Sequence, residues 1–561
     1  MSYNPPRQKP VVTGDPIEIE LVFNLTRCGT CSFFWPENAN RQPYGPYPTF
    51  DFDSNAPKTS PANAKQTAYP WVKGTTQTPS FPDPEVMDGC RKAPIMTIGI
   101  NPNLTAFAPG RMGAAWSYPN FSNAGGTDLY AKYAFYYRYR SVYQERFDLG
   151  FMKAFLVKEG QILAPKAGVV VSAARPSDAP TYDVQVLYDG DTANTTISLK
   201  ENLGEPRYIL LFDTAAPDNR FSKGDVIAAR LDVPAGKAVE IFQQQIGYYE
   251  QIVPVLQRFE TFLSAQGHAG ADLRVGEDVC QLDMVACASP HWGSLFLGGT
   301  NEAVATIVHN CVSKNAWAIK QLVQTQPAVL FLVGESSYDM FRDSFGKLIY
   351  PALPAKPADG AYTLLRETSD PANPRFIKFS TTIGGQKFDL STRLVITPHF
   401  SYNINFLPQF RMSPDGWQQF AQKFSACAQF LRTDPRFKYV ASQDNSYAAY
   451  QIAQDPAGAL AALKQHYAPA LSALQPSFYD PHAMMASVLE DLYNKKQLTY
   501  TVGTNSAPGF LTRGDGSCHF CVNKHWTFPL GCPYGKNLLP PPAVGFLDKV
   551  AAAMVKAGSS Q

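Results

Sequence analysis

Four short apolar runs, separated by segments of helical periodicity, constrain the fold of this chain more than any other feature. Each is almost wholly apolar and ends in glycine or polar residues, which is typical of a buried strand: PIMTIGIN (94–101), VCQLDMVACASP (279–290), AVLFLVGESS (328–337) and RLVITPHFS (393–401). Helical patterns occupy 237–266 and 301–326, and two more strands flank the Gly-Gly pair at 384–385. Strands that alternate with helices predict a three-layer α/β/α core with a mostly parallel sheet.

Polar residues follow these runs where the strands end. Asn101, Asp283, Gly334 and His399 each fall at or near a predicted strand end. Ligands of parallel α/β sheets bind beyond the carboxyl ends of the strands. We therefore expect these residues to lie along one rim of the sheet.

The chain has 561 residues, which is too long for one ordinary hydrophobic core. Several domains or large insertions are therefore expected. Five short β runs separated by turn residues predict an inserted β-barrel-like domain over 155–236. The predicted division is an N-terminal arm at 1–92, a core at 93–154 and 237–412, this insertion, a helical extension at 413–500 and a cysteine-rich, metal-binding tail at 501–561.

Composition excludes several classes of protein. A hydrophobic content of 45% with 17% charged residues describes a globular chain. The N-terminal MSYNPPRQKP has no apolar segment of a signal peptide, and no run of about 18 apolar residues predicts a membrane span. A cytoplasmic protein without membrane contact is therefore expected. The net charge is only +2, so any basic surface for nucleic acid must be local.

Two tetrapeptides at the predicted rim carry chemical meaning. Gly99-Ile100-Asn101-Pro102 places an amide in a tight turn after a strand, where it can orient a water molecule. Pro398-His399-Phe400-Ser401 places an imidazole that, when neutral, can donate a hydrogen bond to an oxygen gaining negative charge. From the residues alone, a plain turn and an ordinary core histidine remain alternatives.

Together these segments resemble the uracil-DNA glycosylase superfamily. The segment GINPNLTAFAPG (99–110) is similar to the first motif of the thymine- and mismatch-specific enzymes, Gly-Ile-Asn-Pro-Gly-Leu. The segment PHFS (398–401) resembles the second motif, His-Pro-Ser. The run DMVAC (283–287) is similar to Asn-Ala-Val-Lys-Cys of the iron–sulfur family 4 enzymes, and the stretch from Cys311 to Gly334 resembles their next strand.

The resemblance implies a DNA glycosylase of base-excision repair, which hydrolyses the N-glycosidic bond of a flipped-out pyrimidine. Asn101 would position the attacking water, and His399 would stabilise the departing base. Base-binding residues would be Gly99, Asn103, Asp283 and the stacking ring of Trp116 or Tyr118. Tyr402, Phe406 and Leu407 would form the wedge that fills the vacated space in the DNA.

The chain departs from the family motifs at three of these positions. Asn103 replaces a glycine, Phe400 replaces the proline of His-Pro-Ser, and Asp283 replaces an asparagine. An asparagine amide both donates and accepts, whereas a carboxylate only accepts. An acceptor suits an exocyclic amine, so we expect an amino-bearing or modified pyrimidine rather than plain uracil; the alternative is that Asp283 only caps a loop.

The ten cysteines indicate metal binding, because disulfides are rare in the cytoplasm. The resemblance to family 4 implies a 4Fe-4S cluster on Cys28, Cys31, Cys287 and Cys311. A second group fits tetrahedral zinc: Cys518, Cys521, His525 and Cys532. Alternatively, the tail cysteines join Cys28 and Cys31 in one site.

Two other functions fit the same residues. One is a non-catalytic protein that recognises modified or damaged DNA bases, for example in defence against foreign DNA. The other is an enzyme that modifies bases or nucleotides, with 155–236 as a second substrate module. All three functions make DNA or its components the partner, and the sequence does not specify whether the DNA is single- or double-stranded or which protein partners it has.

Overall fold

The computed structural model describes residues 93–100, 153–157, 162–174, 181–188, 190–201, 208–210, 226–233, 235–245, 251–273, 275, 278–286, 301–353, 357, 360–441, 448–474, 477–502, 509–514 and 545–559. The predicted N-terminal arm and most of the cysteine-rich tail lie outside these ranges. So do twelve residues singled out above: Cys28, Cys31, Asn101, Pro102, Asn103, Trp116, Tyr118, Cys287, Cys518, Cys521, His525 and Cys532.

A six-stranded sheet organises the core, and it confirms the predicted buried strands. Its order is β11 (Ile349–Tyr350), β12 (Arg375–Ile383), β13 (Gln386–Thr397), β10 (Val329–Val333), β1 (Ile95–Gly99) and β9 (Val279–Asp283). Strands β13, β10, β1 and β9 are parallel neighbours. Strand β12 runs antiparallel to β13 and forms a hairpin with it through Gly384 and Gly385, both at positive φ as a tight turn requires.

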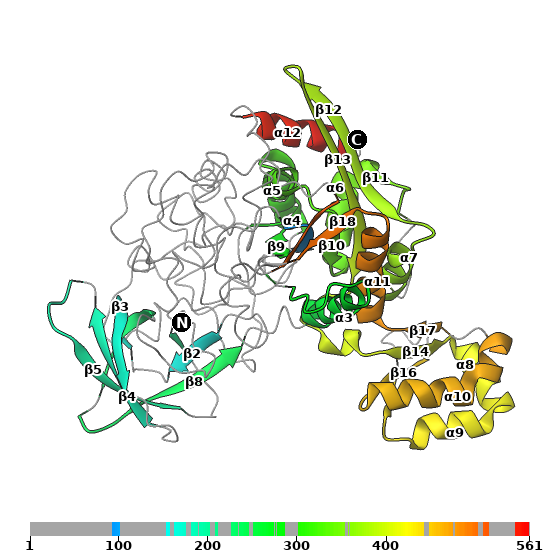
Figure 1. The fold of residues 1–561 in the computed structure, drawn as a ribbon, viewed down its shortest axis with the longest axis horizontal. Coiled ribbons are helices and arrows are strands. Elements are labelled where there is room, and N and C mark those ends of the chain that lie inside the picture. The colour runs from blue at the N-terminus through cyan, green and yellow to red at the C-terminus, as the bar shows by residue number, and fades with distance from the viewer. Residues whose placement is uncertain are drawn as a thin grey trace.

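Helices cover both faces of this sheet, as Figure 1 shows. Alternate residues of β10 belong to different hydrophobic clusters: Leu330 and Leu332 to one, Val329 and Phe331 to the other. The first cluster includes side chains of α5 (Trp317–Thr325), α6 (Glu335–Phe345) and α12 (Phe546–Gly558). The second includes side chains of α3 (Ile252–Ala265), α7 (Gly360–Ser369) and α11 (Pro481–Asn494). Burial on both sides explains why the strands are continuously apolar.

Smaller elements complete the core. They are α4 (Asn301–Val308), the π-helix η3 (His309–Lys314), η4 (Gly346–Leu348), η5 (Asn403–Phe406) and the hairpin of β18 (Leu498–Thr501) with β19 (Phe510–Arg513). The helical prediction for 301–326 is confirmed, apart from the π-helical turn. Within the described ranges, the helices lack the length and apolar character needed to cross a bilayer.

The predicted β insertion is a seven-stranded sheet that begins earlier and ends later than expected. Its strands are β2 (Lys153–Val157), β3 (Ile162–Ala174), β4 (Thr181–Tyr188), β5 (Thr195–Glu201), β6 (Tyr208–Leu210), β7 (Val226–Leu231) and β8 (Val239–Gln245). The edge strands β6 and β7 also contact each other, as in a nearly closed barrel. The helical prediction for 237–266 is wrong in its first part, because β8 there pairs with β2 and β5.

The predicted helical extension at 413–500 is also wrong in part, because strands alternate with its helices. Residues 409–479, here called the module, form β14 (Gln409–Met412), α8 (Pro414–Lys423), α9 (Ser425–Thr433), β15 (Phe437–Ala441), β16 (Ala448–Ile452), α10 (Pro456–Leu474) and β17 (Ser477–Tyr479). The antiparallel order β15-β16-β14-β17 is the split βαβ arrangement.

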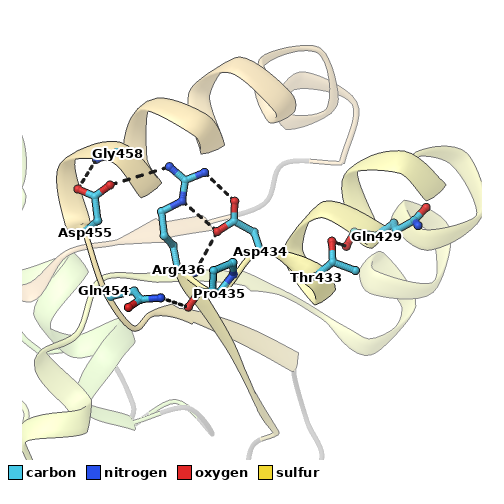
Figure 2. Close-up of polar contacts among 8 residues, drawn as sticks. All are labelled: Gln429, Thr433, Asp434, Pro435, Arg436, Gln454, Asp455 and Gly458. Atoms are coloured by element: carbon cyan, nitrogen blue, oxygen red, sulfur yellow. Dashed lines mark hydrogen bonds and ion pairs between the residues drawn. The ribbon is translucent and has the colours of Figure 1, made fainter.

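A polar cluster joins two turns of the module, and Figure 2 shows its contacts. Arg436 donates from Nε and Nη2 to both carboxylate oxygens of Asp434, at 2.9 and 2.6 Å. Its Nη1 lies 4.0 Å from Asp455, whose carboxylate accepts the N–H of Gly458 in the first turn of α10. Hydrogen bonding to Arg436 lowers the pKa of Asp434 to about 2.

This ion pair predicts an acid-dependent contribution to the stability of the module. Because the folded pKa of Asp434 is depressed, the contribution is present above the unfolded pKa of about 3.9 and is lost as pH falls toward about 2. The wild-type protein should therefore unfold at a higher temperature than Asp434→Asn near pH 6, and this difference should shrink between pH 4 and pH 2. Calorimetry measures it. Asp343→Asn, which removes an exposed pair with Arg342, should show little difference at any pH.

Candidate functional site

The described residues of the predicted rim lie at the carboxyl ends of adjacent parallel strands. Asp283 ends β9 and is the register partner of Gly99, which ends β1. Gly334 follows the last residue of β10, and His399 lies two residues beyond the end of β13. The expectation that Asp283, Gly334 and His399 share one edge of the sheet is therefore confirmed. Asn101 lies outside the described residues, two positions after β1.

The backbone is described up to Ile100, one residue before Asn101, and hydrogen bonds fix its last two residues. Beyond the ends of the two strands, the N–H of Met284 donates to the carbonyl of Gly99 at 3.0 Å, and that of Val285 to the carbonyl of Ile100 at 2.9 Å. These bonds extend the pairing of β1 and β9 past Asp283. Asp283 is half-buried, and its backbone lies opposite Gly99, the last residue of β1.

The turn after β13 selects one tautomer of the neutral His399 ring. The N–H of Ser401 donates to Nδ1 of His399 at 3.2 Å. A ring nitrogen that accepts a hydrogen bond carries no proton, so the proton of the neutral ring lies on Nε2. Burial lowers the pKa of His399 below its usual range. The side chain is thus a neutral imidazole that can donate from Nε2 near pH 7.

Gly334 sets how closely β10 approaches this imidazole. It has a φ of +91°, and a Cβ built on it would lie 3.1 Å from Cδ2 and 3.3 Å from Cβ of His399. Its N–H donates to the carbonyl of Thr397 at 2.8 Å, which extends the pairing of β10 with β13. A side chain at 334 would have to displace the histidine ring.

The predicted wedge contains both exposed and buried residues. Tyr402 is 62% exposed and Leu407 is 37% exposed. Phe406 is only 2% exposed and packs against the rings of Phe400 and His482. Its assignment to the wedge is therefore wrong, because it belongs to the core beneath the loop. Ile404 is the third exposed apolar side chain of this loop, at 46%.

A hydrogen-bonded chain that the sequence did not reveal fixes one side of the loop. Gln251, at the start of α3, donates to Oδ1 of Asn403 at 2.7 Å and accepts from Nε2 of His482 at 3.0 Å. Burial lowers the pKa of His482 to about 4, so its ring is neutral near pH 7. No local pattern predicts this chain, because 152 positions separate Gln251 from Asn403.

Among the predicted metal ligands, the structure describes Cys311. It is buried in the π-helix η3, and its Sγ accepts the N–H of Ala286 at 3.4 Å and donates to the carbonyl of Met284 at 3.8 Å. This sulfur therefore lies beside the backbone that directly precedes Cys287. Within the described residues, no three His, Cys, Asp or Glu side chains are grouped to hold a metal ion.

The contact between Gly334 and His399 predicts an asymmetry between two glycine substitutions. Gly334→Ala and Gly267→Ala both place a side chain at a φ above +90°, but a Cβ at 267 has nothing within 4 Å. The backbone conformation alone destabilises by about 1–3 kcal/mol. Gly334→Ala should lower the free energy of unfolding more than Gly267→Ala, and it alone should shift the ring ¹⁵N resonances of His399. Equal losses with an unperturbed ring would contradict the contact.

No protein-family model, curated protein or solved structure matches this chain. The resemblance to uracil-DNA glycosylases therefore remains an expectation drawn from short motifs.

Proposed function

We propose that this protein is a DNA glycosylase with a uracil-DNA glycosylase-like α/β/α core, acting on a flipped-out pyrimidine. The observation that carries the proposal is the neutral imidazole of His399 at the carboxyl end of β13, on the same rim as Gly99 and Asp283. Substrates of parallel α/β sheets bind at this rim. The motifs around Asn101 and His399 supply the class of reaction.

In the proposed mechanism, His399 donates from Nε2 to the base oxygen on which charge develops as the glycosidic bond breaks. The neutral imidazole keeps its proton while it donates this hydrogen bond to the leaving base. Exclusion of water from the site would strengthen the hydrogen bond. Asn101 orients the water that attacks the sugar carbon. The attacking water loses a proton to solvent as the new C–O bond forms, and the base leaves as an anion that the imidazole stabilises and solvent then protonates.

Asp283 is proposed to select the base. A carboxylate accepts hydrogen bonds and does not donate them, so it favours a pyrimidine with an exocyclic amine. The position of Asp283 supports this role, because Asp283 lies opposite Gly99, which precedes Asn101 by two residues. Excision of uracil far faster than of every cytosine derivative would remove this part of the proposal.

Tyr402 and Leu407 are proposed to enter the DNA stack when the base leaves it. Extraction of a base costs a few kcal/mol of stacking and pairing, and an inserted side chain offsets part of this loss. Both residues are exposed directly after His399. The role of Phe406 is to support this loop from below.

The cofactor proposed from the resemblance is a 4Fe-4S cluster on Cys28, Cys31, Cys287 and Cys311. Its fit can be examined at Cys311, where a buried sulfur accepts a backbone N–H from the residue before Cys287. The N–H suits a cluster thiolate, whereas the bond that the thiol donates to the carbonyl of Met284 would be lost when the sulfur binds iron. The cluster would have a structural role. Zinc on the tail residues Cys518, Cys521, His525 and Cys532 remains a separate proposal.

An alkali-cleavage assay on oligonucleotides with varied pyrimidines tests the activity. The wild-type protein should leave abasic sites, and His399→Ala should lower the single-turnover rate about 10²–10³-fold, as expected for loss of one oxyanion donor. Asn101→Ala should remove nearly all cleavage. His466→Ala, which changes an exposed histidine of the module, should behave as the wild type. Tight binding of a modified base without any cleavage would contradict a glycosylase and favour a recognition protein.

The visible absorption of anaerobically purified protein tests the cofactor. A cluster predicts a brown protein with about four iron atoms per chain. Cys311→Ser should lose this absorption and the iron, whereas Cys280→Ser, at another buried cysteine, should keep both. A colourless wild-type protein with no iron would remove the cluster from the proposal.

A further inference from the structure

Two asparagine side chains attach the loop after His399 to the rest of the protein, although residues 401–404 are all exposed. Tyr402 and Ile404 are exposed, whereas the amides of Asn403 and Asn405 bond to the body of the protein. Asn403 is held from α3 by Gln251. Asn405 is held from α7, where the hydroxyl of Tyr362 donates to its Oδ1 at 2.9 Å.

Tyr362 connects this loop with the module. Its hydroxyl also accepts from Nε2 of Gln409 in β14, at 2.9 Å. Gln409 in turn accepts from Nε of Arg411 at 3.1 Å, and the Arg411 guanidinium carbon lies 3.4 Å from the centre of the Tyr362 ring. The ring of Tyr479 in β17 meets Tyr362 edge-on at 4.9 Å. One tyrosine therefore contacts both strands through which the module joins the core.

We infer that Tyr362 is a positioning residue, whose hydroxyl couples the docked module to the loop that follows His399. The coupling stands on the contacts above, and only its consequence for DNA rests on the proposed function. An apolar loop that is not held tends to fold back onto the protein and bury its side chains. Bonds to Asn403 and Asn405 hold the backbone so that Tyr402 and Ile404 point to solvent.

The chemistry of the hydroxyl explains why tyrosine is needed at this position. The hydroxyl donates to Asn405 and accepts from Gln409 at the same time. A phenylalanine ring can form neither of these hydrogen bonds. Tyr362→Phe keeps the packing on Arg411 and Tyr479 but leaves both amides without this partner. The expected result is a loosened loop on an otherwise unchanged fold.

Hydrogen exchange read by mass spectrometry tests the coupling. The amides of Tyr402 and Asn405 bond to backbone carbonyls within the turn, so peptides covering 400–407 report on the loop. Tyr362→Phe should speed their exchange about five- to tenfold, the change expected from losing a neutral hydrogen bond. Tyr493→Phe is the matched control, because its hydroxyl bonds to His268 at 2.6 Å, away from the loop. It should leave peptides 400–407 unchanged.

If Tyr362→Phe does not fold, truncation of either hydrogen-bond partner of the Tyr362 hydroxyl still tests the coupling. Asn405→Ala removes the loop side and Gln409→Ala the module side, and both should speed exchange in 400–407. Unchanged exchange in Tyr362→Phe, or in Gln409→Ala where Tyr362→Phe does not fold, would overturn the coupling. Peptides of β1 and β10 should stay protected in every variant.

The DNA arm separates this inference from the proposed function. With a duplex carrying 2-aminopurine beside the target base, Tyr362→Phe should slow base extraction about fivefold, lowering kcat with KM nearly unchanged. Its pH profile should match that of the wild type, because the proposed catalytic residues Asn101 and His399 are unchanged. A loosened loop with no effect on base extraction would reject the DNA role of Tyr362 and keep its positioning role. An unchanged loop with slower extraction would reject the positioning role and keep a role in DNA handling.

Discussion

Parallel hydrogen bonding between β13, β10, β1 and β9 is the constraint on which the candidate site depends. Parallel strands place their carboxyl ends at one edge, so residues far apart in the chain meet there without any contact of their own. Gly99 and Asp283 are opposite each other for this reason. Gly334 then meets His399 because β10 and β13 end side by side. Loss of register between any two of these strands would separate the residues of the rim.

The strands of the core were predictable because burial on both faces produces continuous apolar runs. VLFLV of β10 is an example, since each of its residues is fully buried. The rim positions of Gly99, Asp283 and His399 followed from the ends of those runs. The β3 to β7 strands of the insertion were visible for a related reason: alternate residues of β4 are buried and exposed, which produces the period of two.

Other elements depend on long-range contacts that leave little trace in the local sequence. Strand β16, AAYQI, is rich in alanine and lies between helices, so its pairing with β14 and β15 decides its conformation. Phe406 and Tyr402 lie in one short apolar segment, and only the tertiary fold makes one a core residue and the other exposed. Tyr362 gave no signal, because its partners Asn405 and Gln409 are 43 and 47 positions away.

The neighbouring positions of β14 and β17 in the module sheet have an evolutionary consequence. The chain leaves the core and returns to it at nearly the same point. The module is therefore equivalent to an insertion between η5 and α11. An insertion of this kind can be gained, lost or exchanged by recombination without rethreading the central sheet. A chain of this fold with a short connection in place of 409–479 would therefore keep the rim of the central sheet intact.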